Sequence, residues 1–115
     1  MKTISPLVIL LMLGLSTAAL AHTRLSTSNP ADGAEIAAPS DIRLEFSAPV
    51  RLTAVKLESA SGSEVELGDI PADVAASFSV AIDEPLAAGA YVVTWRSISG
   101  DTHVVSGEFR FTVTE

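Results

Sequence analysis

Short segments in which apolar and polar residues alternate are the dominant pattern along this chain. Residues 42–46 (IRLEF), 55–58 (VKLE) and 107–113 (GEFRFTV) each place every second side chain on one apolar face, which is the period of a half-buried β-strand. Residues 91–96 (YVVTWR) are rich in β-branched and aromatic side chains and predict a central strand. The pattern therefore predicts a protein built from strands.

Clusters of turn-forming residues separate these segments, for example NPADG at 29–33 and SGS at 61–63. No segment carries a sustained helical stripe, and residues 72–76 (ADVAA) allow at most one turn of helix. Several short strands joined by such turns predict a single all-β domain, an immunoglobulin-like antiparallel Greek-key β-sandwich. We expect five aromatic residues to carry its core: Phe46, Tyr91, Trp95, Phe109 and Phe111.

The first 21 residues have the layout of a secretory signal peptide. Lys2 supplies a positive charge, residues 7–15 (LVILLMLGL) are apolar, and ALA at 19–21 offers the small residues that a signal peptidase reads. The apolar run is shorter than the about 20 residues that a membrane-spanning helix needs. We therefore predict cleavage after Ala21, export to the periplasm, a domain of residues 22–115 and no stable membrane insertion. Cleavage one residue earlier or later is the main alternative.

Composition narrows the choice of partners. Without residues 1–21 the chain has six basic and fourteen acidic residues, a net charge of −8. Such a surface repels the phosphates of nucleic acid, which is therefore not an expected partner. The chain contains no cysteine, and this excludes thiol catalysis and thiolate metal sites. Any metal site must use nitrogen and oxygen ligands.

The chain has only two histidines, His22 and His103. Cleavage before His22 would make it the first residue, and its α-amine and ring Nδ1 would then close a six-membered chelate on one metal ion. Asp101 and His103 are two residues apart, so their side chains share a face if residues 101–103 are extended. Together the three residues would offer three nitrogens and one oxygen, a donor set that suits tetragonal Cu(II).

Each of these residues also has an ordinary interpretation. Asp101 follows Gly100, a pairing that is common in hairpin turns, His103 taken alone fits an exposed strand position, and His22 could follow the cleavage site by chance. The metal-site hypothesis depends on the three residues together. It also requires a fold that brings position 22 beside position 101, which the sequence alone does not show.

Three blocks of the chain carry a family resemblance. They are HTRLSTSNPADGA from His22, IRLEFSAPV from Ile42 and PLAAGAYVVTWRSISGDTHVVSGEFRFTV from Pro85. The last block is the most specific, because its glycine, tyrosine and tryptophan spacing is followed by the D-x-H element of Asp101 and His103. In these blocks the chain resembles the periplasmic copper-resistance CopC family, which are small exported β-sandwich proteins that carry copper.

The resemblance implies a function and a site. It implies one Cu(II) ion per chain, bound by His22, Asp101 and His103, in a periplasmic protein of copper homeostasis whose partner would be an inner-membrane copper transporter. Two features depart from the family. Residues 22–115 contain no methionine, which excludes the methionine-rich Cu(I) site of some members, and Ala48 stands where some members have a glutamate.

Two neighbouring residues of the expected central strand have separate interpretations. Trp95 shares a face with Tyr91 and Val93 and is expected in the core, with a position lining the metal site as the alternative. Arg96 points to the opposite face and is expected to be solvated.

Three functional classes remain open from the sequence. The favoured one is a binding protein that sequesters or carries Cu(II) and is not an enzyme. An amine and two imidazoles also form the histidine brace of copper monooxygenases, so an oxidative copper enzyme is the alternative. A metal-free immunoglobulin-like interaction module is the third class, and it would leave both histidines unexplained.

Overall fold

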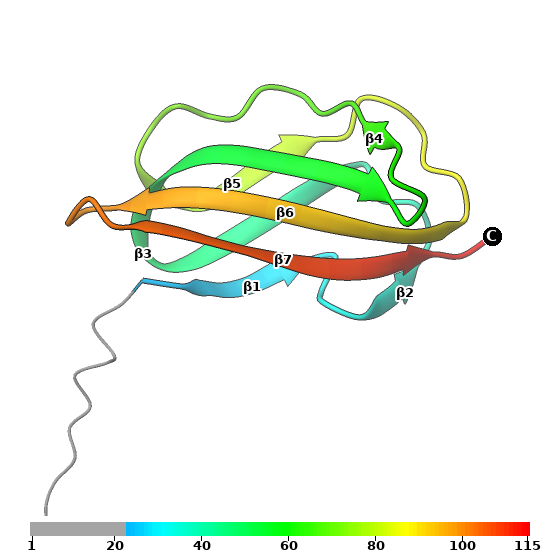
Figure 1. Cartoon of the computed structure of the whole chain (residues 1–115), viewed down its shortest axis with the longest axis horizontal. Coiled ribbons are helices and arrows are strands. Elements are labelled where there is room, and N and C mark those ends of the chain that lie inside the picture. Colours follow the sequence, from blue (N-terminus) through cyan, green and yellow to red (C-terminus); the bar gives the residue numbers. More distant parts are fainter. Residues whose placement is uncertain (1–22) are drawn as a thin grey trace, which may run out of the picture.

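The computed structural model describes residues 23–115, which form seven strands and no helix (Figure 1). The strands are β1 (Leu25–Asn29), β2 (Ala34–Ile36), β3 (Asp41–Ser59), β4 (Glu64–Val65), β5 (Ala75–Ala81), β6 (Gly89–Ser99) and β7 (Val104–Val113). Within this part of the chain no helix is long and apolar enough to cross a membrane. The all-β prediction is confirmed.

Strand β3 belongs to both layers of the β-sandwich. Its first part pairs antiparallel with β1 and β5, and its second part pairs antiparallel with β6 and β4. The register of its pairing with β5 shifts between Glu45 and Val50, and Pro49 lies within this shifted segment. Proline has no N–H to donate to a ladder and is tolerated at such irregularities. The segments expected as two strands at 42–46 and 55–58 are therefore one bent strand.

The second layer closes through β7, which pairs antiparallel with β6 along its length. β2 then adds to β7 in parallel register, from Ala34 opposite Phe111 to Ile36 opposite Val113. The turn before β2 fixes this direction, because the Asp32 carboxylate accepts from Arg110 N at 3.0 Å and Gly33 N donates to Arg110 O at 2.6 Å. The sandwich is thus the expected one except that this one pair is parallel.

Residues 72–76 form no helical turn. The expectation of at most one turn there is replaced by an extended chain, in which Ala75 begins β5 and pairs with Val50 of β3. Of these residues Ala75 and Ala76 belong to β5, and a strand that pairs with β3 has backbone hydrogen-bond partners that an isolated turn of helix would lack.

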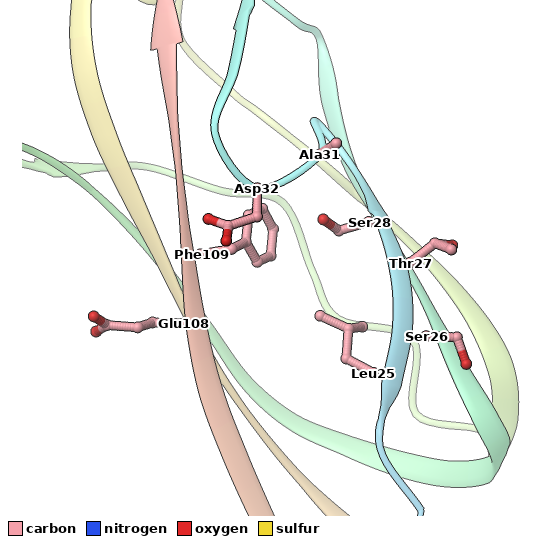
Figure 2. A pocket seen from close by; sticks show the side chains of 8 residues that line it. All are labelled: Leu25, Ser26, Thr27, Ser28, Ala31, Asp32, Glu108 and Phe109. Atoms are coloured by element: carbon pink, nitrogen blue, oxygen red, sulfur yellow. The ribbon is translucent and has the colours of Figure 1, made fainter.

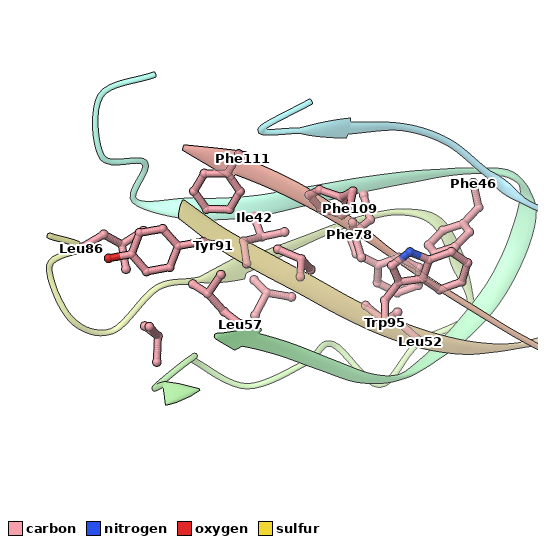
Figure 3. Packing of buried hydrophobic residues seen from close by; sticks show 14 of the residues in the cluster. Ile42, Phe46, Leu52, Leu57, Phe78, Leu86, Tyr91, Trp95, Phe109 and Phe111 are labelled. Atoms are coloured by element: carbon pink, nitrogen blue, oxygen red, sulfur yellow. The ribbon is translucent and has the colours of Figure 1, made fainter. Parts of the chain in front are cut away.

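The core lies between the two layers (Figure 3). All five aromatic residues expected there are buried, with at most 7% of the surface of each exposed. Trp95 packs edge-on against Phe46 with ring centroids 5.2 Å apart, and Tyr91 stacks on Phe111 at 5.6 Å. Offset or edge-on aromatic pairs add stabilisation beyond the area they bury. Arg96 is exposed on the opposite face of β6, as predicted.

Gly107 makes room for the Trp95 indole. The two residues face each other across the β6–β7 ladder, and a Cβ atom on Gly107 would lie 2.8 Å from Trp95 Cζ2. This distance is shorter than any van der Waals contact between carbons, and the indole is also held by Phe46 on β3. A side chain at position 107 must therefore displace a buried ring.

We expect Gly107→Ala to destabilise the domain by about 1–3 kcal/mol through this overpacking. For a domain of this size each kcal/mol lowers the melting temperature by about 4–8 °C. Thermal melts followed by circular dichroism measure the effect. Gly100→Ala is the matched control, because no atom lies within 4 Å of the Cβ position there. Equal melting temperatures for the two variants would contradict this account of the core.

Candidate metal centre

Asp101 and His103 lie in the tight turn that joins β6 to β7. Thr102 N donates to Ser99 O at 2.9 Å, and Ser99 N donates to His103 O at 2.9 Å. Thr102 has a φ of 67°, in the left-handed region that a tight turn requires. The extended conformation considered for residues 101–103 is therefore absent, and the hairpin-turn interpretation of Asp101 is correct.

The turn nevertheless brings the two side chains together. His103 Nδ1 lies 3.0 Å from Asp101 Oδ2, and His103 N lies 3.4 Å from Asp101 Oδ1. Both side chains are mostly exposed, at 73% for His103 and 68% for Asp101. The left-handed residue between them reverses the chain, so the side chains meet at the tip of the hairpin. They converge as predicted, but for a different geometric reason.

Ser99, at the end of β6, forms hydrogen bonds to residues of this turn. It is buried, with 9% of its surface exposed, and its hydroxyl donates a short hydrogen bond to Asp101 Oδ1 while lying 3.2 Å from His103 O. Sequence reasoning missed Ser99. The available signal was its position on the inward face of β6, where a serine takes the place of an apolar residue two positions before Asp101.

The hydrogen bond from Ser99 is the main cause that lowers the pKa of the Asp101 carboxyl; desolvation opposes it, and the backbone N–H and ring of His103 lower the pKa further. Asp101 is therefore ionised at neutral pH and acts only as an acceptor. His103 Nδ1–H must then donate to Asp101 Oδ2, which leaves the lone pair on Nε2. Imidazole nitrogen and carboxylate oxygen are both donor types that suit a divalent cation.

The beginning of the described chain lies at the same end of the sandwich as this turn (Figure 1). Arg24 N donates to Ser47 Oγ at 3.0 Å, and Ser47 N donates to Arg24 O at 2.8 Å. Three residues further along β3, Val50 pairs with Ser99. His22 lies outside the described residues.

Two further residues named from the sequence have clear positions. Ala48 is half-buried in the bent segment of β3, next to Ser47. Trp95 precedes Ser99 by four residues on β6, about 13 Å along the strand, and we assign it to the core. Residues 23–115 contain no group of three or more histidine, cysteine, aspartate or glutamate side chains placed to hold a metal. Asp101 and His103 thus form a pair of donors within the described chain.

A separate groove of about 400 Å³ lies between β1 and β7 (Figure 2). Leu25 from β1, Phe109 from β7 and Asp32 lie between the two strands, whereas the carboxylate of Glu108 points to the other side of β7. Asp32 already accepts from Arg110 N, and Glu108 pairs with Arg110 Nη2 at 3.1 Å. Because these carboxylates are engaged by Arg110, we assign the groove no function.

Comparison with known proteins agrees with this architecture. Copper resistance protein C of Escherichia coli is 36% identical over 114 residues, covering 90% of each chain, and its namesake from Xanthomonas campestris pv. juglandis is 34% identical over 97% of this chain and 96% of its own. The crystal structure of PcoC, described as a methionine-rich copper resistance protein from E. coli, superposes with a TM-score of 0.69 at 35% identity, covering 81% of this chain and 99% of PcoC.

The CopC domain family matches residues 25–114, from the first strand to the residue after the last one. This span includes the bent strand β3 and the turn that carries Asp101 and His103. The resemblance stated from the sequence is confirmed, and the chain belongs to the CopC domain family.

Proposed function

We propose that the chain is an exported copper-binding protein that holds one Cu(II) ion through His22, Asp101 and His103. The observation that carries the proposal is that the turn with Asp101 and His103 lies at the end of the sandwich where the described chain begins, at the residue that follows His22. The names of the related proteins, copper resistance protein C, support copper as the cargo.

The chemistry of these donors fits Cu(II). After cleavage, His22 would offer its α-amine and imidazole, His103 a second imidazole and Asp101 an ionised carboxylate. Such nitrogen and oxygen donors suit tetragonal Cu(II), whereas Cu(I) prefers thioether and thiolate sulfur. Both methionines of the chain, Met1 and Met12, lie in the predicted signal peptide, and there is no cysteine. The site is therefore proposed to hold Cu(II) alone.

The cellular setting follows from the same proposal. Cleavage after Ala21 would release the domain into the periplasm, where it sequesters Cu(II) or delivers it to an inner-membrane copper transporter. Because Asp101 and His103 are exposed at the tip of a hairpin, a partner can reach the ion without opening the sandwich.

A methionine retained before His22 should weaken Cu(II) binding by more than about tenfold, which is about 1.4 kcal/mol. The extra residue converts the amine into an amide, so the chelate with the His22 ring is lost. Competition titration of the authentic and extended proteins measures the affinities, and native mass spectrometry of the exported protein gives its first residue and metal content. Equal affinity of both forms would refute a role for the amine.

Cu(II) affinity should fall steeply as the pH drops from about 7 to 5. The two imidazoles and the amine bind the metal only in their unprotonated forms, so protons compete with the metal as the pH falls. Asp101 stays ionised over this pH range, because its pKa is lowered and lies below the range.

His103→Ala should cost more Cu(II) affinity than Asp101→Asn, because the first variant loses a nitrogen donor whereas the second keeps an oxygen donor.

The controls for this experiment are melting curves of the metal-free variants. Both side chains are mostly exposed, so neither substitution should change stability by more than about 0.5 kcal/mol. Wild-type affinity in His103→Ala would place the copper elsewhere on the molecule.

We propose a carrier rather than an oxidase because Asp101, as the fourth ligand of the proposed site, would occupy the coordination position that oxygen needs. The copper-loaded protein should therefore not sustain oxidation of ascorbate with peroxide production above the rate of free Cu(II). Sustained copper-dependent turnover on a polysaccharide would instead favour the monooxygenase alternative.

A further inference from the structure

We propose that Ser99 is a positioning residue for the metal ligands, whose buried hydroxyl holds Asp101 and His103 in the arrangement that binds the cation. This inference rests on the proposed function, because it assigns Ser99 a role toward the same two ligands. It adds a residue that does not itself touch the metal.

The contacts of Ser99 connect both ligands to one atom. Its Oγ donates to Asp101 Oδ1 and lies 3.2 Å from the carbonyl oxygen of His103. That carbonyl also accepts from Ser99 N at 2.9 Å, while Ser99 O accepts from Thr102 N at 2.9 Å. Every hydrogen-bonding group of Ser99 is therefore directed to the turn that carries the two ligands.

The position of Ser99 makes it a rigid support. It ends β6, which pairs on one side with β3 and on the other with β7, and it is opposite Val50 of β3. Asp101 and His103 are exposed and depend on such contacts for a fixed orientation. A hydrogen bond from a buried hydroxyl removes rotamers of the Asp101 side chain before the metal binds, which lowers the entropic cost of binding.

Packing does not explain a serine at this position. The inward face of β6 carries Tyr91, Val93 and Trp95 before it reaches Ser97 and Ser99, and all five residues are buried. Burying a hydroxyl is unfavourable unless it finds a partner. Ser99 finds its partner in the carboxylate of Asp101, so its side chain contributes to the turn and not to the apolar core.

Ser97 provides a matched control in the same strand. It is also buried, at 1% exposed, and its Oγ lies 3.3 Å from Val105 O. Its hydroxyl thus binds a backbone carbonyl of β7. Ser97→Ala removes a buried hydroxyl without altering support of the ligands.

The test compares Cu(II) affinity and the electron paramagnetic resonance spectrum of Ser99→Ala, Ser99→Thr and Ser97→Ala. We expect Ser99→Ala to lower affinity by about 10–100-fold, as loss of a hydrogen bond to a metal ligand does, and to shift the spectrum. Ser99→Thr keeps the hydroxyl and should retain most of the affinity, while Ser97→Ala should match the wild type in both measurements. Melting curves of the metal-free variants show that each is folded.

Two results would overturn the inference, and they differ in what else they overturn. If His103→Ala abolishes tight binding but Ser99→Ala keeps wild-type affinity and spectrum, the positioning role is wrong and the proposed function stands. If His103→Ala itself keeps wild-type affinity, the proposed site and the role of Ser99 both fail.

Discussion

The bend in β3 is the constraint on which the candidate site depends. Before the bend this strand pairs with β1 and β5, and after it with β6 and β4. Ser47, within the bend, fixes the beginning of the described chain through Arg24, and Val50, just after it, fixes the end of β6 through Ser99. One continuous strand thus sets the position of the N-terminal segment relative to the hairpin tip.

Alternation of apolar and polar residues predicted the layers and the core well. It succeeded because every second residue of a strand lies on the same face, so the local sequence shows which face is buried. Examples are Phe109 and Phe111 on one strand and Tyr91 and Trp95 on its neighbour. It could not show that residues 42–46 and 55–58 belong to one strand, since the connecting SAPV segment resembles a loop. The parallel direction of β2 could not be predicted either, because it depends on contacts that Asp32 and Gly33 make with Arg110, far away in the sequence.

The candidate site was predictable in its residues and less so in its geometry. Histidine is rare in this chain, so His103 stood out, and Asp101 stood out beside it. Their contact was expected from strand periodicity, yet it arises from a left-handed Thr102 in a turn. Threonine rarely adopts this conformation, so the local sequence pattern gave no reason to predict the turn geometry. Ser99 escaped notice because a single serine in a strand has no distinctive spacing.

The separation of the hairpin tip from the core has a consequence for how such proteins can diversify. Gly100, Asp101, Thr102, His103 and Val104 are all exposed, whereas the nearest inward positions of β6 are the buried serines. Substitutions at the tip would therefore alter the proposed ligand set without changing the packing of the two layers. Half-buried Ala48, in the bend of β3, offers another place to add a donor. Mutations at these positions would thus change the metal preference of the proposed site in small steps, while the packing of the core stays the same.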